Sequence, residues 1–474
     1  MAEQYDLVVL GGGPGGYVGA IRAAQLGMKV ALVEKENVGG VCLHKGCIPT
    51  KSMLYSASLY HQMKESETYG IRSENVQVDL SMVHSRKNQI IGQLQKGVEH
   101  LLKKNKVDVY SGYGRILGPS IFSPLPGTVS VQTSPEEEGT LLVPQNLLLA
   151  TGSSPRFLEG LDYDGQSILN SDHALQMEEL PNSMLILGGG AIGIEWASML
   201  SDFGVDVTVL EVADRILPGE DVEISREMTR VLKKKGVKVF SEVTVAVDTV
   251  QVIEGEVKLQ AEVKGASSHF SAEKLLVSVG RTPNVKDIGL DNTAIKVERG
   301  AVVVNPFQQT AEKHIYAIGD LVGGFQLAHV AMREAVIAVE HMADQSPEPL
   351  QKRQVPRCIY SRPEVASIGF TEQEAKDQGY QVKVGKVPFR TVGKSLVMGE
   401  VDGMVKLVVD AKTEDLLGAH LIGADATNLI SEAGLAQLLD GTAWEIGQLI
   451  HPHPTLSELI GEAALAVDGL AIHG

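Results

Sequence analysis

The N-terminal part of the chain consists of a short apolar run, a glycine-rich break and a longer run with helical spacing. Residues 5–10 are apolar like a β-strand, glycine and proline fill 11–16, and 17–26 have helical periodicity. A second strand-like run at 29–33 ends at Glu34. Strand-length apolar runs joined by a helix are typical of a βαβ unit, so we predict one here.

The same pattern returns near the middle of the chain. An apolar run at 184–187 leads into a glycine-rich break at 188–193, and a helical pattern at 194–203 follows. The next strand-like run, 206–210, again ends at an acid, Glu211. The chain is therefore predicted to contain two βαβ units, each with its own glycine-rich turn.

The remaining segments extend this α/β pattern and change it near the C-terminus. A length of 474 residues corresponds to roughly three domains of about 150 residues each. We predict an α/β fold with two Rossmann-like dinucleotide-binding domains and a C-terminal α+β domain. The other expected elements are a helix at 83–104, hairpins at 109–149 around a loop at 134–139, strands at 274–279 and 314–318, a linker at 349–356, a β-rich stretch at 382–422 and helices at 426–439 and 457–467.

Charge and hydropathy restrict the possible partners. The chain has 42 lysines and arginines against 59 aspartates and glutamates, a net charge of −17 that is spread along its length. It lacks the basic patch that binds nucleic acid or anionic lipid. Its apolar runs are far shorter than the about 18 residues that span a bilayer, and the N-terminus has no signal-peptide pattern. We expect a cytoplasmic protein that binds neither nucleic acid nor membranes.

Two of the three cysteines stand close together directly after the first βαβ unit. Cys42 and Cys47 are five residues apart, whereas Cys358 lies alone in an apolar stretch typical of a core. A helix that begins near Cys47 would favour thiolates, and a dithiol beside a dinucleotide can pass electrons to it. A metal site that includes His44 or His61 lacks the usual zinc spacing, and two inert buried cysteines are a further alternative. We favour redox chemistry.

Each glycine-rich break contains a GxGxxG motif, with an acid 18 residues after its last glycine. The glycines allow a tight turn and a close approach to a pyrophosphate at a helix N-terminus, and the acid can bind ribose hydroxyls. A single motif also fits a plain structural turn, but two complete motifs predict two dinucleotide sites. The residues are Gly11, Gly13, Gly16 and Glu34 in the first unit and Gly188, Gly190, Gly193 and Glu211 in the second.

The second acid favours one pyridine nucleotide over the other. Glu211 would repel the 2′-phosphate of NADP, and the next arginine is Arg215. This pattern predicts NAD as the cofactor, although the nearby arginine leaves NADP as an alternative.

A histidine and an acid near the C-terminus allow two interpretations. Thr455 and Glu458 have the spacing of a helix capping box, in which the acid binds a backbone N–H group. Alternatively, Glu458 orients the ring of His453, which then acts as a general base for a thiol. Sequence pattern alone supports both equally.

Further motifs complete a set that matches a known family. The chain resembles the flavoprotein disulfide oxidoreductases that use two dinucleotides, and among them the dihydrolipoamide dehydrogenases, over essentially its whole length. The resemblance implies tightly but non-covalently bound FAD in the first site, NAD in the second and no metal. The motifs are 11–16, 40–51, 150–153, 188–195, 280–284, 317–320 and 453–458.

The resemblance also implies a reaction and roles in it. Dihydrolipoamide would be oxidised through a Cys42–Cys47 disulfide and FAD, and NAD would receive the hydride, as in the E3 component of 2-oxo acid dehydrogenase complexes. Cys42 would exchange with the substrate and Cys47 would face the flavin. Lys51 and Glu195 would pair near the flavin ring. His453, oriented by Glu458, would be the catalytic base.

Binding residues follow from the same resemblance. Further contacts are implied in addition to the glycine motifs, Glu34, Glu211 and Lys51. The implied FAD contacts are Gly114, Thr151, Gly152, Ser153, Asp320, Gln326, Leu327, Ala328 and His329, and the implied NAD contacts are Glu195, Val243 and Gly280.

The implied assembly is a homodimer with shared active sites. Each active site would contain the disulfide of one subunit and the catalytic histidine and glutamate of the other subunit. Its partners would be the lipoyl domain and the subunit-binding domain of an E2 component. The implied division is an FAD-binding domain at 1–149, an NAD-binding domain at 150–275, a segment completing the FAD site at 276–349 and a dimerisation domain at 350–474.

Departures from the family pattern are few. His44 and Lys45 stand where many members have Asn-Val, and 324–327 differs from the more frequent Gly-Pro-Met-Leu. These changes bear on the redox potential and the fit of the substrate, and they remove no catalytic group.

Other members and other classes fit less well. A glutathione-type reductase would prefer basic residues at Glu211 and Val212, and a mercuric reductase would need another cysteine pair beyond Cys358. A non-catalytic flavoprotein subunit or a thiol-independent transhydrogenase would have no need for the Cys42 and Cys47 pair.

Overall fold

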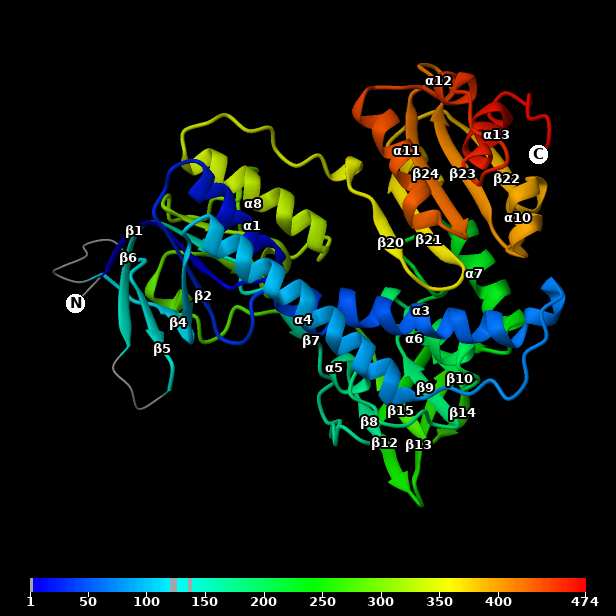
Figure 1. The fold of residues 1–474 in the computed structure, drawn as a ribbon, viewed down its shortest axis with the longest axis horizontal. Coiled ribbons are helices and arrows are strands. Elements are labelled where there is room, and N and C mark those ends of the chain that lie inside the picture. Colours follow the sequence, from blue (N-terminus) through cyan, green and yellow to red (C-terminus); the bar gives the residue numbers. More distant parts are fainter. Residues whose placement is uncertain (1–2, 120–125, 135–138) are drawn as a thin grey trace. The chain divides into compact units, whose positions relative to one another are not determined.

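The computed structural model describes residues 3–119, 126–134 and 139–474. The chain divides into two compact units, whose helices and strands are labelled in Figure 1. The first unit comprises Met1–Ser52, Ser81–Arg156 and Arg281–Leu350, and the second comprises Met53–Leu80, Phe157–Gly280 and Gln351–Gly474. In the part of the chain that the structure describes, no helix combines the length and apolar character that a membrane crossing requires.

The first unit is built on a sheet whose central strand is the predicted first strand. β1 pairs in parallel with β2 on one side and β6 on the other, and the order is β3-β2-β1-β6-β5-β4 with β19 also on β6. The elements are β1 (Glu3–Leu10), α1 (Pro14–Gln25), β2 (Val30–Glu34), α2 (Gly40–His44), α3 (Cys47–Lys64, which continues into the second unit), α4 (Leu80–Lys104), β3 (Asp108–Ser111), β4 (Tyr113–Ile116), β5 (Val129–Gln132), β6 (Thr140–Leu149), β7 (Ser153–Pro155), β16 (Arg281–Pro283), η2 (Leu290–Asn292), β17 (Val297–Glu298), β18 (Ala301–Val302), β19 (Ile315–Ala317), η3 (Gly319–Val322) and α8 (Ala328–Met342).

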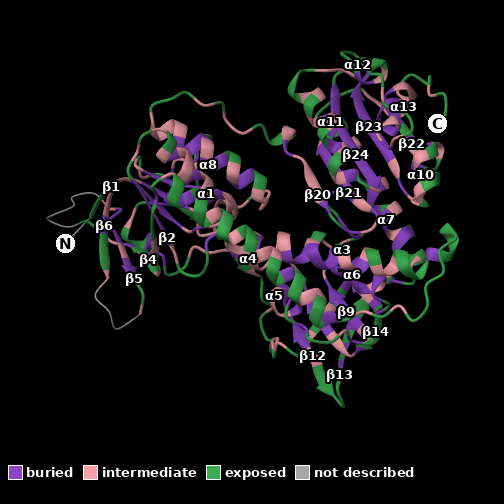
Figure 2. Ribbon diagram, viewed as in Figure 1, coloured by how far each residue is buried: buried purple, intermediate pink, exposed green. Residues whose placement is uncertain are grey.

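Helices α1 and α8 cover one face of this sheet, and small residues let them approach closely. A Cβ on Gly15 would lie 2.8 Å from the Ile318 side chain, and one on Gly19 would lie 2.8 Å from Leu148. The C-terminal halves of the central strands, residues 7–10 of β1 and 147–149 of β6, are apolar and buried because both faces of the sheet are covered there (Figure 2). The parallel strands β1, β2, β6 and β19 all end at the same edge, which therefore collects the residues that follow them.

One expectation for this unit is wrong in part. The stretch 109–149 was expected to form hairpins, and β4, β5 and β6 are antiparallel as predicted. β3, however, runs parallel to β2, because it joins the opposite edge of the sheet after the long helix α4. The loop expected at 134–139 includes 135–138, which lie outside the described residues.

The second unit contains three sheets. The first has the order β11-β10-β9-β15-β8 and is parallel, β12-β13-β14 is an antiparallel meander, and the C-terminal sheet has the order β20-β21-β24-β23-β22. Its elements beyond α3 are η1 (Ser66–Tyr69), β8 (Ile168–Leu169), α5 (Ser171–Ala174), β9 (Ser183–Leu187), α6 (Ala191–Asp202), β10 (Asp206–Leu210), α7 (Val222–Lys234), β11 (Lys238–Phe240), β12 (Val243–Ile253), β13 (Glu256–Val263), β14 (Ala266–Ala272), β15 (Lys274–Val277), η4 (Lys352–Gln354), β20 (Arg357–Ile359), β21 (Glu364–Gly369), α9 (Glu372–Asp377), β22 (Val382–Pro388), η5 (Phe389–Thr391), α10 (Gly393–Met398), β23 (Met404–Asp410), β24 (Leu416–Gly423), α11 (Ala426–Leu438), α12 (Ala443–Gln448) and α13 (Glu458–Ala466).

The C-terminal sheet is covered by the two helices that the sequence predicts there. Every residue of β24 is buried, and α11 and α13 pack their apolar faces on the sheet (Figure 2). The predicted α+β character of this segment is confirmed.

A buried lysine joins the C-terminal sheet to helix α7. Lys406 on β23 is fully buried, and its Nζ lies 3.0 Å from Asp221, 2.8 Å from Glu223 and 2.7 Å from Glu372. Burial alone would lower the pKa of Lys406, but its hydrogen bonds to the three carboxylates raise it above the usual value. The lysine is therefore charged, and it neutralises a cluster of acids that would otherwise repel one another.

We expect Lys406→Met to destabilise the second unit by about 3–5 kcal/mol, because it leaves the buried Asp221 carboxylate without its cation. Thermal and urea unfolding measure the effect. The matched control is Lys386→Met, since Lys386 pairs with Glu223 at 3.0 Å but is half-exposed, and its loss should cost less than about 1 kcal/mol. Equal effects of the two substitutions would contradict this account.

The pH dependence of this cluster has a definite sign. Burial raises the pKa values of Asp221 and Glu223, but their hydrogen bonds bring both below the usual range, and bonds from Lys376 and Lys406 lower the pKa of Glu372. The stabilisation is then complete above the unfolded-state pKa values of about 4 and disappears as the pH falls through the lower native values. The difference in melting temperature between wild type and Lys406→Met should shrink in acid.

Candidate active site

The two neighbouring cysteines form a disulfide at the start of a helix. Cys42 lies on α2 and Cys47 is the first residue of α3, with their Cα atoms 4.7 Å apart. The prediction that a helix begins near Cys47 is confirmed, so the positive end of the α3 dipole lies beside this sulfur. Such a position stabilises a thiolate when the disulfide opens.

The disulfide segment is held directly against the first glycine motif. The Gly39 N–H donates to the Gly12 carbonyl at 2.8 Å. Gly40 has a φ of +57°, and a Cβ on it would lie 2.6 Å from the Gly13 Cα. Only glycine fits at both places, so the local backbone brings the redox pair to the edge of the first dinucleotide site.

The two unusual residues between the cysteines bind the preceding loop. The His44 Nε2 lies 3.0 Å from the Val38 carbonyl, and the Lys45 Nζ lies 2.6 Å from the Glu36 carboxylate. The Lys45 hydrogen bond lowers the pKa of Glu36 although burial opposes it. The departure from the family pattern thus ties this segment to 36–38.

The first glycine motif forms a cradle without room for side chains. A Cβ on Gly11, whose φ is +105°, would lie 2.3 Å from the Ala150 carbonyl oxygen, and one on Gly16 would lie 1.8 Å from the Gly11 carbonyl oxygen. Gly13 is the N-cap of α1 and offers no capping side chain. The N–H groups of the first helical turn therefore remain available to an anion such as the pyrophosphate of FAD, and these residues fit that group.

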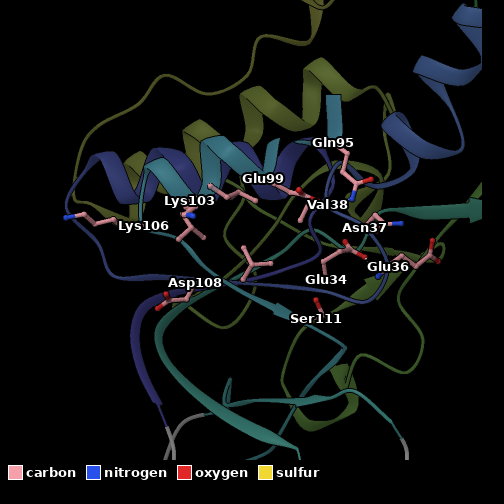
Figure 3. Close-up of a pocket in the computed structure, with 13 residues that line it drawn as sticks. Glu34, Glu36, Asn37, Val38, Gln95, Glu99, Lys103, Lys106, Asp108 and Ser111 are labelled. Atoms are coloured by element: carbon pink, nitrogen blue, oxygen red, sulfur yellow. Dashed lines mark hydrogen bonds between the residues drawn. The ribbon is translucent and has the colours of Figure 1, made fainter. Parts of the chain in front are cut away.

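Glu34 closes one end of this site and lines a pocket of about 510 Å³. Its carboxylate accepts the Gly12 N–H at 2.7 Å and the Glu36 N–H at 2.8 Å, which fixes it at the end of β2. Figure 3 shows it at the pocket with Val38 and with Gln95 and Glu99 of α4. The pocket adjoins the glycine cradle and can accept the adenosine end of a dinucleotide.

The predicted residues after β6 and β19 meet in a hydrogen-bonded cluster. The Ser153 hydroxyl donates to Asp320, and Arg281 donates to the Ser153 hydroxyl and carbonyl, both at 2.7 Å. Thr151 and Asn284 exchange hydrogen bonds of 3.0 and 2.9 Å. Sequence reasoning used 280–284 as a family motif but assigned no role to Arg281 or Asn284, which position this edge.

The other predicted FAD residues lie on different elements of the first unit. Gly114 on β4 has a packing role, since a Cβ there would lie 2.2 Å from Leu10 and 3.0 Å from Val33. Gly152 has a φ of +68°. The segment of Gln326, Leu327, Ala328 and His329 forms the N-terminus of α8, with Leu327 as the N-cap.

The second glycine motif repeats the geometry of the first. A Cβ on Gly188 would lie 2.6 Å from the Ser278 carbonyl oxygen, and one on Gly193 would lie 1.9 Å from the Gly188 carbonyl oxygen. Gly190 is the uncapped N-cap of α6. Gly280 has a φ of +110° with open space around it. The residues again fit a dinucleotide pyrophosphate, here that of the pyridine nucleotide.

Glu211 is fixed by backbone groups, and the nearby arginine is engaged elsewhere. Its carboxylate accepts the Gly189 N–H at 2.5 Å and the Ala213 N–H at 2.7 Å, and its carbonyl accepts the Val243 N–H at 2.9 Å. The Arg215 guanidinium donates to Asp214 at 3.1 Å and to the Pro218 carbonyl at 2.9 Å. The side chain of Val243 is buried, and its contact with NAD stays a prediction.

Lys51 and Glu195 belong to different units. Lys51 lies on α3, and Glu195 is a buried residue of α6 whose carboxylate accepts the Tyr360 N–H at 3.0 Å. Their pairing near a flavin stays a prediction.

The histidine and acid near the C-terminus are in contact. The His453 Nδ1 lies 2.8 Å from Glu458 Oε1, while Glu458 Oε2 accepts the Thr455 N–H at 2.9 Å. Burial alone would raise the pKa of Glu458, but the bonds from His453 and Thr455 lower it. One oxygen of Glu458 thus binds the Thr455 backbone, and the other contacts an imidazole whose side chain is 77% exposed. The full capping box is not formed, because the Thr455 hydroxyl donates to the Pro452 carbonyl and the N-cap of α13 is Ser457. The role of His453 as a base stays a prediction.

Comparison with known proteins identifies the family of this chain. Residues 5–335 match the model of the pyridine nucleotide-disulphide oxidoreductases, and residues 355–464 match the dimerisation domain of that family. The chain belongs to the pyridine nucleotide-disulphide oxidoreductase family. The expected fold and the resemblance are confirmed, and this oxidoreductase depends on FAD and a pyridine nucleotide.

Relatives of this oxidoreductase include well-covered dihydrolipoyl dehydrogenases. It is 59% identical to the dihydrolipoyl dehydrogenase of Bacillus subtilis and 43% identical to that of Zymomonas mobilis, over 100% of each chain. Among solved structures, LpdA from Mycobacterium tuberculosis has a TM-score of 0.89 at 25% identity and covers 98% of this chain and 99% of its own. The disulfide reductase RclA from Escherichia coli has a TM-score of 0.84 at 26% identity, covering 98% and 100%.

Proposed function

We propose that this oxidoreductase is a dihydrolipoyl dehydrogenase that oxidises dihydrolipoamide to lipoamide and uses NAD as the final acceptor. The observation that carries the proposal is the Cys42–Cys47 disulfide held against the cradle of Gly11 to Gly16. A redox disulfide at this place can receive electrons from a dithiol and pass them on within the same site. The full-length similarity to dihydrolipoyl dehydrogenases supports the choice of substrate.

The chain's own residues perform the thiol chemistry in our proposal. His453, oriented by Glu458, takes the proton from one substrate thiol, and the resulting thiolate attacks the Cys42 sulfur. The Cys42–Cys47 bond breaks, Cys47 leaves as a thiolate, and a mixed disulfide joins Cys42 to the substrate. The second substrate thiol attacks that bond, which forms the cyclic disulfide product and leaves Cys42 and Cys47 reduced. Bound FAD supplies the means to accept this electron pair and deliver it as a hydride to NAD.

We propose further that two copies share their active sites. The C-terminal domain exposes large apolar side chains, and Ile450 is 93% exposed only three residues before His453. A second copy that covers this surface would bring His453 and Glu458 to the disulfide of the other subunit. The exposed residues at the end of α11, on α12 and in the following loop are Leu435, Leu438, Leu439, Trp444, Leu449 and Ile450.

We propose that residues 1–149 and 276–349 hold FAD, with Lys51 and Glu195 paired beside it, that 150–275 hold NAD and that 350–474 form the dimer contact. The lipoyl domain and the subunit-binding domain of an E2 component are the proposed protein partners, and the cytoplasm is the proposed location.

The proposed function is tested by a direct assay of the FAD-loaded protein. Dihydrolipoamide with NAD should produce NADH, and glutathione disulfide with NADPH should give no comparable rate. A protein active only with NADPH and glutathione disulfide would contradict the proposal and place the chain with the glutathione-type reductases.

We expect Glu211→Ala to lower kcat/KM for NAD by about 10–100-fold, because it removes a charged acceptor of hydrogen bonds at the ribose. The double variant Glu211→Ala/Asp214→Ala should in addition gain activity with NADP, because it releases Arg215 from Asp214. Steady-state kinetics with both nucleotides measure the effect. Glu211→Gln keeps an acceptor for only one of the two backbone N–H groups and should therefore fall between wild type and Glu211→Ala. An unchanged preference for NAD in the double variant would contradict the assignment.

We expect Leu439→Asp to weaken the dimer and lower lipoamide-dependent activity in proportion, since Leu439 is 70% exposed at the end of α11. Light scattering and the NADH assay, run over a range of protein concentrations, check this. Val252→Asp, at an exposed position of β12, is the control. A Leu439→Asp protein that stays dimeric would show that another surface makes the contact.

A further inference from the structure

A tight turn from Leu217 to Glu220 supports the second glycine motif. The Leu217 N–H donates to the Gly189 carbonyl at 2.8 Å, and the Glu220 N–H closes the turn on the Leu217 carbonyl at 3.0 Å. A Cβ on Gly189 would lie 2.7 Å from the Ile216 side chain, so the contact is close. The turn thus touches the loop that carries Gly188 and Gly190.

The turn has a backbone conformation that its sequence does not favour. Leu217 has a φ of +48° and is 3% exposed. Leucine rarely adopts the left-handed region, so surrounding contacts must hold it there. One such contact is the Ser225 hydroxyl, which donates to the Ile216 carbonyl at 2.6 Å.

The side chain of Glu220 anchors the turn to the C-terminal sheet. Glu220 is buried, at 8% exposure. Arg357 on β20 donates through Nε to Oε1 at 3.2 Å, and the Ser367 hydroxyl on β21 donates to Oε2. Both carboxylate oxygens are therefore bound by strands of a different sheet from the one that bears the glycine motif.

We propose that Glu220 is a positioning residue for the pyridine nucleotide. By fixing the Leu217–Glu220 turn between the C-terminal sheet and Gly189, it keeps the glycine loop and Glu211 in the arrangement that receives the pyrophosphate and the ribose. The inference rests on the proposed NAD site and deepens it. Residues of the C-terminal domain, Arg357 and Ser367, thereby contribute to nucleotide affinity without touching the nucleotide.

Binding of ADP-ribose to the oxidised holoenzyme tests the proposal, because this probe has the pyrophosphate and ribose of NAD but cannot accept a hydride. We expect Glu220→Ala to weaken its binding by about tenfold in calorimetric titration. Glu220→Gln fills the same space and keeps one acceptor oxygen, while its amide nitrogen can donate to the Ser367 hydroxyl, so it should recover part of the affinity. Ser367→Ala, which removes only one donor, should weaken binding in the same direction but less.

The control is Glu364→Gln, on the same strand as Ser367. Glu364 accepts the Thr427 N–H at 2.9 Å and the Thr427 hydroxyl at 2.8 Å, within the C-terminal domain and away from the turn. It should leave ADP-ribose affinity unchanged, and reduction of the enzyme by dihydrolipoamide should stay at the wild-type rate in all four variants. Wild-type affinity in Glu220→Ala, or an equal loss of affinity in Glu364→Gln, would overturn the role of Glu220 but leave the proposed NAD site standing. A wild-type holoenzyme that binds no ADP-ribose would overturn the NAD site as well.

Discussion

Cys47→Ser is expected to abolish lipoamide-dependent NADH formation, with a loss of about 10³-fold or more, the scale seen when a nucleophile is removed. Without the second sulfur no disulfide exists for the substrate thiolate to open, so the exchange with Cys42 cannot begin. The NADH assay with dihydrolipoamide measures the loss. Reduction of an artificial dye by NADH should survive, because that reaction does not need the disulfide.

The matched control for this prediction is Cys358→Ser. Cys358 is the third cysteine of the chain and is not part of the disulfide. It should keep wild-type activity, and flavin absorbance should show equal FAD loading of both variants. Substantial lipoamide activity in a fully loaded Cys47→Ser protein would refute the thiol mechanism and favour direct transfer between substrate and flavin.

His453→Gln is expected to slow reduction of the enzyme by dihydrolipoamide by about 10²–10⁴-fold, the range of general base catalysis. Glutamine keeps a polar side chain of similar size but cannot take the thiol proton. The loss should be smallest in alkaline solution, where the substrate thiol ionises without help. Anaerobic stopped-flow absorbance of the flavin, as a function of pH, measures it.

Two further variants separate the base from the helix cap. His473 and Glu462 form a second His–Glu pair in the same domain, 3.0 Å apart and with an exposed histidine, so His473→Gln is a close geometric control that should leave the rate unchanged. Glu458→Gln can still accept the Thr455 N–H but loses its charge beside His453. If Glu458 serves only the backbone before α13, that variant will leave the rate at the wild-type value.

Local pattern accounts for most of the elements. The runs at 5–10, 184–187 and 206–210 became strands, and the helix expected at Cys47 begins there. These predictions succeed because local signals determine such elements. The period of apolar residues, glycine at turns and polar residues at the ends of elements all depend on a few neighbouring positions. β3 was placed wrongly because strand partners are chosen by the whole sheet, and no neighbouring residue reveals that Asp108–Ser111 pairs with β2.

Sequence alone named the candidate residues for the chemistry. They are two glycine motifs with their acids, a close cysteine pair and a histidine five residues before an acid, and their combination is far more specific than any one of them. Their order along the chain also determined the family resemblance, which the comparisons confirmed.

Only the tertiary structure decided how those residues are held. It placed Gly39 and Gly40 against Gly12 and Gly13, gave Gly114 a packing reason, and showed that Glu458 serves both His453 and the backbone. The link from Glu220 to Arg357 and the burial of Lys406 among acids join segments more than a hundred residues apart. Such contacts leave no periodic trace in the sequence, because they depend on which faces of separate sheets meet, and that is set by packing of the whole core.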